Sequence, residues 1–344
     1  MCQAFAAAGH DVTLFAKPGE TIEDEYGFYG VSPTFKVAKS VATGTRRVRE
    51  WVYANRTLRE VKRGKPFDLI YGRHLPSLAL VAKGDIPFIY EAHQPASFLG
   101  RLVERQLFRR RNLTRTVFIS ESLRTHYRSA FPEINDLKTV VAHDASIADV
   151  TLPSPQPTAD KSGLAVGYSG SLYAGRGIEI ICALAERLPD VSFHICGGSP
   201  SEIQHYSSVA TGCKNLEFHG FLPPSQISEW QQAMDVLLAP YQLDGPIVQW
   251  TSPLKIFEYM ASGQPIVASD VPVLREVLTD GVNALLISPE DVSGWALALQ
   301  RLSDDRLRKF LATNAVNDLR SKYTWEQRVH RVLETSVRTL ADAP

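Results

Sequence analysis

The chain has 344 residues, of which 44% are hydrophobic and 22% are charged, and its formal net charge is zero. A zero net charge creates no overall field that would attract nucleic acid, so the sequence predicts no nucleic-acid partner. It contains no apolar run long enough for a membrane-spanning helix, and residues 1–12 lack the pattern of a secretory signal. These features predict a cytoplasmic globular protein, and the length favours two domains.

Short apolar runs rich in Val, Ile and Phe alternate along the chain with longer segments of helical periodicity. Runs that are apolar throughout and are separated by helices are typical of parallel strands covered on both faces. The sequence therefore predicts an α/β protein with two doubly wound, Rossmann-like domains. The expected strands are Val12–Ala16, Asp68–Tyr71, Pro87–Tyr90, Val117–Ser120, Thr139–Ala142, Leu164–Ser169, Val191–Cys196, Leu216–His219, Val236–Ala239, Ile266–Ala268 and Ala284–Ile287.

The N-terminal domain, expected over residues 1–150, begins in an unusual way. A doubly wound domain should open with a strand, a glycine-containing loop and a helix, whereas this chain opens within what resembles that helix. We therefore expect the first, central strand to be missing, either because the start codon is placed too far downstream or because the chain is a fragment. A domain that truly lacks this strand is the alternative, although it would leave a central gap in backbone pairing.

Residues 151–163 contain three prolines and no apolar period, so they are predicted to be a linker. The second domain is expected over residues 164–323. A C-terminal helix is expected over residues 324–344, and packing back onto the first domain is one option for it. The four cysteines show no CxxC spacing, which favours reduced thiols over disulfides or a zinc site.

Small residues follow the first strand of the second domain. The chain reads Gly170–Ser171 after this strand, and Arg176 stands just before the next helix. Glycine lets the backbone approach a ligand closely, and an arginine at such a loop can reach an anion. A phosphate-binding loop is one interpretation, and an ordinary strand-to-helix turn with a solvent-facing arginine is the other.

A second candidate for anion binding lies at the start of the segment TSPLKIFEYMASGQPIVASDVPVLRE (251–276). Pro253 suits the first turn of a helix, on which Thr251, Lys255 and Glu258 are predicted to share a face. The N–H groups of a helix start, with Lys255 beside them, suit a phosphate, and Glu258 suits sugar hydroxyls. The alternative is an exposed helical ion pair, which would contribute about 0.2–0.5 kcal/mol. Both patterns follow parallel strands, so they would converge at the carboxyl edge of one sheet.

Together these segments resemble glycosyltransferase family 4, a large family of retaining enzymes with the GT-B fold. The resemblance covers nearly the whole chain except the missing strand, and the block at 252–278 carries it most specifically. The resembling segments are GYSGSLYAGRG (167–177), LEFHGFL (216–222), MDVLLAPY (234–241), SPLKIFEYMASGQPIVASDVPVLREVL (252–278) and DGVNALLISPED (280–291), with weaker ones at IYEAHQPASF (89–98), FISESLRTHY (118–127) and VVAHDASI (140–147). It implies an acceptor-binding and a donor-binding domain that face each other across a cleft.

The resemblance also implies which residues bind a nucleotide-sugar donor. Arg176 and Lys255 would neutralise the diphosphate, and Glu258 would bind the ribose hydroxyls of the nucleotide. His93 would contact the donor sugar, although a structural histidine is the alternative at this position. Backbone hydrogen bonds to the donor would come from Gly170, Ser171, Thr251, Ser252, Pro253 and Leu254.

Two positions depart from the pattern of the family. Trp250 stands where many members have a glutamate near the donor sugar, and Ser171 stands where many have an arginine. The usual sugar contacts therefore cannot be carried over, and Gln249 or Asp244 would have to replace them.

The reaction implied is sugar transfer with retention of configuration, for polysaccharide or glycoconjugate biosynthesis. The chain has no Asp-x-Asp pair placed after a strand to hold a divalent ion, so we expect metal-independent stabilisation of the diphosphate and no cofactor. No paired carboxylates suggest a double displacement. Two alternatives remain: a catalytically impaired nucleotide-binding partner subunit, and a sugar-nucleotide epimerase of the same fold.

The acceptor would be a glycan, a lipid-linked molecule or a small molecule, bound by the first domain. Glu91 and Gln94 are candidates for contact with it. The arginine-rich stretch 101–115 also contains apolar residues, so peripheral contact with the inner face of a membrane is one interpretation. A solvated helix that packs on the sheet is the other.

Overall fold

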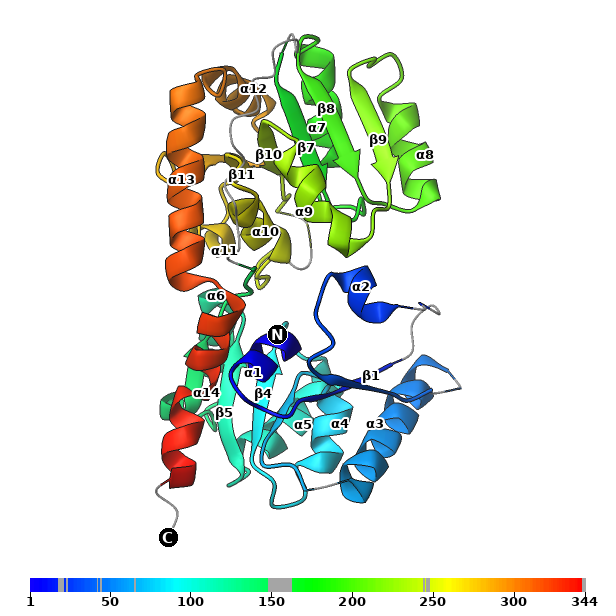
Figure 1. Cartoon of the computed structure of the whole chain (residues 1–344), viewed down its shortest axis with the longest axis vertical. Helices are drawn as coiled ribbons and strands as arrows, with labels where there is room; N and C mark the ends of the chain where they lie inside the picture. The colour runs from blue at the N-terminus through cyan, green and yellow to red at the C-terminus, as the bar shows by residue number, and fades with distance from the viewer. Residues whose placement is uncertain are drawn as a thin grey trace. The chain divides into compact units, whose positions relative to one another are not determined.

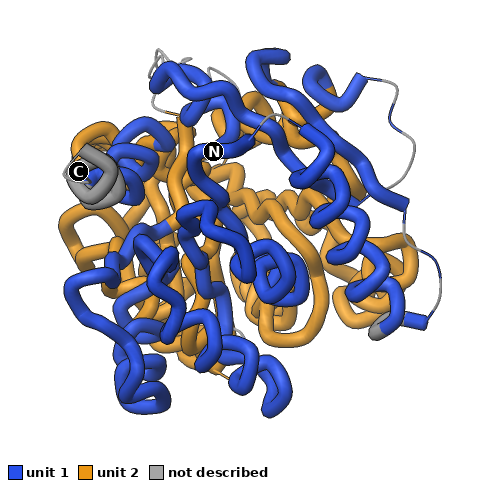
Figure 2. Tube along the Cα trace, turned by 90° about the horizontal axis from the view of Figure 1, so that it is seen from below, with its two compact units in different colours: residues 1–27, 31–143, 325–344 blue, residues 28–30, 144–324 orange. Residues whose placement is uncertain are grey.

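The computed structural model of the protein describes residues 1–17, 22, 24–41, 43, 45–64, 66–147, 163–243, 245 and 248–341. The chain forms two compact units, which Figure 2 shows in different colours. The first comprises residues 1–27, 31–143 and 325–344, and the second comprises residues 28–30 and 144–324. The C-terminal segment from Trp325 therefore groups with the N-terminal residues. Apart from Gly163, the expected linker 151–163 lies outside the described residues.

The first unit alternates strands with helices (Figure 1). Its strands are β1 (Thr13–Ala16), β2 (Lys36–Lys39), β3 (Ile70–Gly72), β4 (Phe88–Ala92), β5 (Leu113–Phe118) and β6 (Thr139–Val141). Its helices are α1 (Cys2–Ala7), α3 (Arg46–Arg63), α4 (Leu75–Val81), α5 (Phe98–Phe108), α6 (Glu121–Ala130), the 3-10 turn η1 (Asp136–Lys138) and α14 (Trp325–Ala341). Helix α2 (Glu25–Tyr29) begins in the first unit, and its last two residues belong to the second unit.

The strands of the first unit form two separate parallel sheets. Strand β1 pairs with β2, and the second sheet has the order β3-β4-β5-β6. Among the described strands none joins the two sheets. Ala4 of α1 and Val332 of α14 pack with Ile89 and Val117 of the larger sheet, so both ends of the chain contribute to one core.

Two strands of the first unit differ from the prediction because polar residues interrupt their apolar pattern. Strand β2 was not predicted, since Lys36 and Lys39 enclose only two apolar residues. Strand β5 begins at Leu113 instead of Val117. Arg115 lies within β5 but is only 5% exposed, and its guanidinium donates to the carbonyl oxygen of Val332 at 3.1 Å.

The second unit is a six-stranded parallel sheet with helices around it. Its strands are β7 (Ala165–Ser169), β8 (Ser192–Cys196), β9 (Leu216–Gly220), β10 (Val236–Ala239), β11 (Ile266–Ser269) and β12 (Leu285–Ile287). Its helices are α7 (Ile178–Arg187), α8 (Pro200–Val209), α9 (Pro224–Gln232), α10 (Leu254–Ser262), α11 (Pro272–Arg275), α12 (Val292–Arg301) and α13 (Asp305–Lys322). The order β12-β11-β10-β7-β8-β9 reverses direction between β7 and β10.

Separate apolar cores cover the two faces of this sheet. On one face Ile195 packs with Leu184 of α7 and Trp295 of α12. On the other face Leu237 packs with Phe257 of α10, together with residues of α13. Burial on both faces explains why these strands are apolar throughout, and it confirms the predicted doubly wound architecture.

The longest helices, α3 and α13, have 18 residues each and carry charged side chains. Neither these two nor any other helix in the described ranges is long and apolar enough to cross a membrane.

Candidate functional site: two buried cations at the strand switch point

The residues predicted to bind an anion meet in the second unit where its strand order reverses. The loop 170–177 follows β7, Tyr241 follows β10, and Lys255 lies in the first turn of α10. In parallel sheets the carboxyl ends of the two strands at such a switch point flank the ligand-binding crevice. Tyr259 of α10 bridges the same two strands, because its hydroxyl accepts from the Ser169 N–H at 2.9 Å and donates to the Leu238 carbonyl oxygen at 3.2 Å.

Lys255 brings a positive charge into this crevice without a polar partner. Its Nζ is buried and has no hydrogen-bond partner. The ammonium lies over the ring of Tyr168, 3.8 Å from the centroid, and 5.4 Å from the ring centre of Tyr241. Burial and the charge of Arg176 hold the pKa of Lys255 well below its ordinary value, and Glu258 opposes this shift.

Arg176 is the second cation of the site. Its guanidinium lies 4.4 Å from the ring centre of Tyr173 and 5.2 Å from that of Tyr241, and it donates to the Tyr173 hydroxyl. Its Nε is buried without a hydrogen-bond partner. Arg176 and Thr251 line a small cavity. Within the described part of the chain, neither Arg176 nor Lys255 forms an ion pair with a carboxylate, so the arrangement suits an added anion.

Gly170 accommodates Lys255 instead of donating to a ligand, which corrects one prediction. Its N–H already donates to the carbonyl oxygen of Cys196 at 2.9 Å. A Cβ atom at Gly170 would lie 2.7 Å from Lys255 Nζ, and φ is +146°, so glycine permits the close approach of the ammonium. Ser171 is exposed, and its carbonyl oxygen accepts from the Tyr168 hydroxyl at 2.7 Å.

The start of α10 also differs from the prediction. Thr251 and Ser252 precede the helix, because the residue before a proline is driven out of the helical region, and Pro253 itself is the extended N-cap. Pro253 has no N–H to donate. The hydroxyl of Ser252 is already used, since it accepts from the Asp144 N–H at 2.8 Å. Of the predicted donors in this segment, Thr251 lines the cavity and Leu254 begins the helix.

Glu258 follows Lys255 by one helical turn, as predicted, but the two do not form an exposed ion pair. Burial raises the pKa of Glu258, and the charge of Lys255 partly opposes this. Trp250, which stands where many family members have a glutamate, is half-buried. Of the two suggested replacements, Gln249 is exposed and Asp244 lies outside the described residues. The predicted diphosphate and ribose residues are therefore brought together, whereas the contacts to a sugar are not identified.

His93 belongs to a polar network in the first unit. Its Nε2 lies 2.5 Å from Glu91 Oε1, and the other carboxylate oxygen of Glu91 accepts from Arg328 of α14 at 2.9 Å. Burial opposes the charge of Glu91, yet the hydrogen bond from His93 and the charge of Arg328 lower its pKa. Glu91 is only 6% exposed, so the suggestion that it contacts an acceptor was wrong. It instead holds His93 in place.

Sequence reasoning missed the aromatic residues and Arg328. Tyr168 and Tyr241 lie within segments that resemble the family, but their contacts with the cations depend on the folded sheet. Arg328 lies 237 residues from Glu91, and no local pattern could have linked them.

Two family models match the chain. Residues 1–143 match the model described as "Glycosyltransferase Family 4", and residues 164–305 match the model described as "Glycosyl transferases group 1". Among curated relatives, a phosphatidyl-myo-inositol mannosyltransferase of Mycolicibacterium smegmatis is 30% identical over 198 residues, which is 56% of this chain and 49% of the relative. The chain spans about half the length of the curated relatives that it matches.

Solved structures share the fold over nearly the full length. Sucrose-phosphate synthase of Thermosynechococcus elongatus superposes with a TM-score of 0.78 at 18% identity, covering 99% of this chain and 92% of the other. HepE of Anabaena, solved with UDP and glucose, superposes with a TM-score of 0.70 at 17% identity, covering 97% of this chain and 100% of the other. The chain therefore has the GT-B fold, and its residues 1–143 and 164–305 match glycosyltransferase domain models.

Proposed function

We propose that the protein transfers a sugar from a nucleotide-sugar to an acceptor, with retention of configuration and without a metal ion. The observation that carries this proposal is the pair of cations at the switch point. Lys255 Nζ and Arg176 Nε are both buried without hydrogen-bond partners. Such an arrangement is costly in the free protein and is explained if a diphosphate completes it.

In this proposal the two cations stabilise the departing nucleoside diphosphate. Negative charge grows on the diphosphate as the bond to the sugar breaks, and fixed positive groups lower the barrier when they are already oriented. The tyrosine rings hold Arg176 and Lys255 in place before the donor arrives. Glu258 binds the ribose hydroxyls.

His93 is proposed to contact the sugar through the ring nitrogen that Glu91 does not occupy. Its side chain is 29% exposed, whereas Glu91 and Arg328 behind it are buried. Retention of configuration rests on the family resemblance. The proposed acceptor is a glycan, a lipid-linked molecule or a small molecule. Since matching relatives are named for inositol phosphate and phosphatidyl-inositol, inositol-containing acceptors are the first to test.

A donor screen tests the proposal. The purified chain is incubated with UDP-, GDP- and ADP-sugars, with and without inositol acceptors, and both nucleoside diphosphate release and the anomeric configuration of the product are measured. We expect transfer from one donor class, an unchanged rate in EDTA, and loss of transfer in His93→Ala. If the protein binds a donor but releases no nucleoside diphosphate, the result would support the alternative of a catalytically impaired partner subunit. Conversion to an epimeric sugar without transfer would support the epimerase.

We also propose that α5 brings the first unit to an anionic membrane surface. Phe98, Leu99 and Leu102 are 79%, 65% and 46% exposed, and Arg101 lies beside them. The patch begins before the predicted stretch 101–115 and excludes Leu107, Phe108 and Arg115 of that stretch, which are buried. An exposed apolar face next to arginines suits the headgroup region of anionic lipid.

Vesicle sedimentation tests this membrane contact. Replacing Phe98 and Leu99 together by serine should lower the bound fraction on phosphatidylglycerol vesicles at least about tenfold, because two apolar side chains no longer enter the bilayer interface. Leu137→Ser is the matched control, since Leu137 is 86% exposed elsewhere in the first unit. Equal binding of both variants would contradict the assignment of α5.

A further inference from the structure

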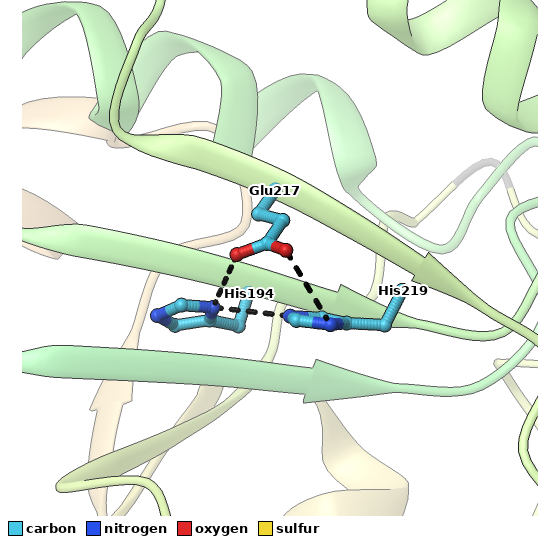
Figure 3. A group of neighbouring side chains, drawn as sticks. All are labelled: His194, Glu217 and His219. Atoms are coloured by element: carbon cyan, nitrogen blue, oxygen red, sulfur yellow. Dashed lines mark hydrogen bonds and ion pairs between the residues drawn. The ribbon is translucent and has the colours of Figure 1, made fainter.

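Two histidines and a glutamate gather on the face of the second-unit sheet that lies opposite α7 and α8. His194 is on β8, and Glu217 and His219 are on the neighbouring edge strand β9. His194 is directly paired with Glu217 in the strand register, and His219 follows Glu217 by two residues, so all three side chains share a face. Figure 3 shows the three side chains pointing toward one another. This group takes no part in the donor site.

We propose that His194, Glu217 and His219 bind one divalent transition-metal ion of the zinc type. Each residue offers one ligand atom, and these atoms lie within 4.8 Å of one another. His194 Nδ1 is 3.1 Å from His219 Nε2 and 3.6 Å from Glu217 Oε2. A tetrahedral zinc ion with bonds of about 2.0–2.1 Å holds its ligand atoms about 3.3 Å apart. The two distances from His194 Nδ1 are therefore close to those required, and Glu217 Oε1 lies 3.8 Å from the other ring nitrogen of His219, Nδ1.

The contact with Ser192 favours the tautomer of His194 that a metal needs. The Ser192 hydroxyl donates to the Leu164 carbonyl oxygen at 3.3 Å, so its lone pairs face His194 Nε2, which is 3.2 Å away. This favours a proton on Nε2 and leaves the lone pair on Nδ1, which faces the other two ligands. A hydrogen bond to the distal ring nitrogen is the usual way in which a metal-binding histidine is oriented.

His219 is held by Trp230 of α9, whose ring centre lies 5.9 Å away in an edge-on arrangement. In the absence of metal, His194 Nδ1 and His219 Nε2 are hydrogen-bonded at 3.1 Å through a proton carried by one of them. A metal ion would replace that proton and bind both lone pairs. Glu217 is 65% exposed, so a water molecule can complete the coordination from the solvent side.

The sequence did not predict this ligand set. The three residues do not form a local motif, and only the pairing of β8 with β9 brings them together. A bound ion would link β8 to the edge strand and oppose its separation from the sheet. The expected role is therefore stabilisation of this edge, independent of sugar transfer.

Calorimetric titration with Zn²⁺ tests the site in the full-length chain after treatment with EDTA and desalting. The wild type should bind one Zn²⁺, and no binding should be detected for His194→Ala or His219→Ala, because each lacks one of the three ligands. His205→Ala is the matched control, since His205 is exposed on α8 of the same unit and outside the group. Ser192→Ala, which keeps all three ligands, should weaken binding by about tenfold because the ring of His194 is no longer oriented.

Two further measurements make the result unambiguous. Co²⁺ should give the intense visible absorption of a tetrahedral site in the wild type and in His205→Ala, and not in the two histidine variants. Saturating Zn²⁺ should raise the Tm of the second unit on the order of 5 °C in the wild type and in His205→Ala, and leave it unchanged in the His194→Ala and His219→Ala variants. The metal-free Tm of the variants shows whether they are folded. No Zn²⁺ binding by the wild type, or equal binding by His194→Ala and His219→Ala, would overturn the proposal.

Discussion

At the scale of single residues, the main feature is a lysine whose charge is unfavourable in the free protein. Lys255 Nζ is buried next to Gly170, and the positive charge of Arg176 adds to the cost. The contact with the Tyr168 ring offsets part of this, by about 2 kcal/mol for a desolvated pair. The part of this free-energy cost that is not offset is typical of a binding site, because the buried lysine and the neighbouring arginine both become favourable once a dianion is bound.

The lowered pKa of Lys255 predicts proton uptake when a nucleoside diphosphate binds. The unfolded chain holds this proton up to about pH 10.4, so the cost of the buried charge is largest below the folded pKa and disappears as pH rises toward 10.4. A bound anion raises the pKa again. At a pH between the pKa of Lys255 in the free protein and its pKa in the complex, calorimetry of UDP binding in buffers of different ionisation enthalpy should report uptake of up to one proton.

The control is Lys255→Met, which has no titratable amine. Proton uptake that persists in this variant would assign the effect to another group.

The residues of the site were predictable where their chemistry is local. Arg176, Lys255 and Glu258 were identified from charge and spacing near a strand end, and the sheet brings them to one crevice. The roles of Gly170 and Ser252 were not predictable, because the sequence does not show that Cys196 and Asp144 already engage their polar groups. Long-range hydrogen bonds therefore limit what local patterns can say about backbone donors.

At the scale of elements, the loop 170–177 is held against the end of β10. Gly177 is the N-cap of α7 with φ of +75°, and a Cβ atom there would lie 1.7 Å from the Pro240 carbonyl oxygen. This close approach positions Arg176 beside Tyr241.

Gly177→Ala should lower the free energy of unfolding by about 3 kcal/mol or more, because strain at a positive φ adds to a clash with backbone. Gly281→Ala is the control: φ is +69° there, but nothing lies within 4 Å of the added Cβ. It should lose only about 1 kcal/mol in denaturant unfolding. Equal losses would show that the approach to Pro240 is unimportant.

Helix α14 ties the C-terminal part of the chain to the strands of the first unit. Arg328 is 5% exposed and donates to Glu91 at 2.9 Å and to the His143 carbonyl oxygen at 2.8 Å. The ion pair therefore supports the carboxylate that holds His93.

Arg328→Ala should destabilise the first unit by about 3–5 kcal/mol, because Glu91 would remain buried without its cation. Arg331→Ala on the same helix is exposed and should change stability by less than about 0.5 kcal/mol. Thermal unfolding of both variants provides the comparison, and a mild effect of Arg328→Ala would show that Glu91 does not depend on it.

The success of strand prediction also depended on burial. Strand β10 was predicted to the residue because both of its faces are buried and its four residues are apolar. Strands β2 and β5 were missed or shortened, since Lys36, Lys39 and Arg115 break the apolar run. Arg115 is compatible with the sheet only because carbonyl oxygens of α14 accept its protons, and this partner is distant in sequence.

At the scale of the whole molecule, the two units divide the proposed chemistry. The second unit contains the anion site at the switch point and, on another face of the same sheet, the proposed metal site. The first unit contains His93 and the exposed apolar residues of α5. The fold was predicted from alternating strands and helices, whereas neither the metal site nor the support of His93 could be, because each depends on strands and helices brought together by folding.

The most direct test of the account is calorimetric binding of UDP, GDP and ADP to the wild type and to Lys255→Met. For the tightest of the three, the variant should bind about 100-fold more weakly, because loss of a buried charged partner costs about 2–5 kcal/mol. Without nucleotide, the Tm of Lys255→Met should equal or exceed that of the wild type, because an unpaired buried charge is removed. Lys214→Met, an exposed lysine of the same unit, should bind like the wild type. Unchanged affinity in Lys255→Met would contradict the assignment of this site to the diphosphate.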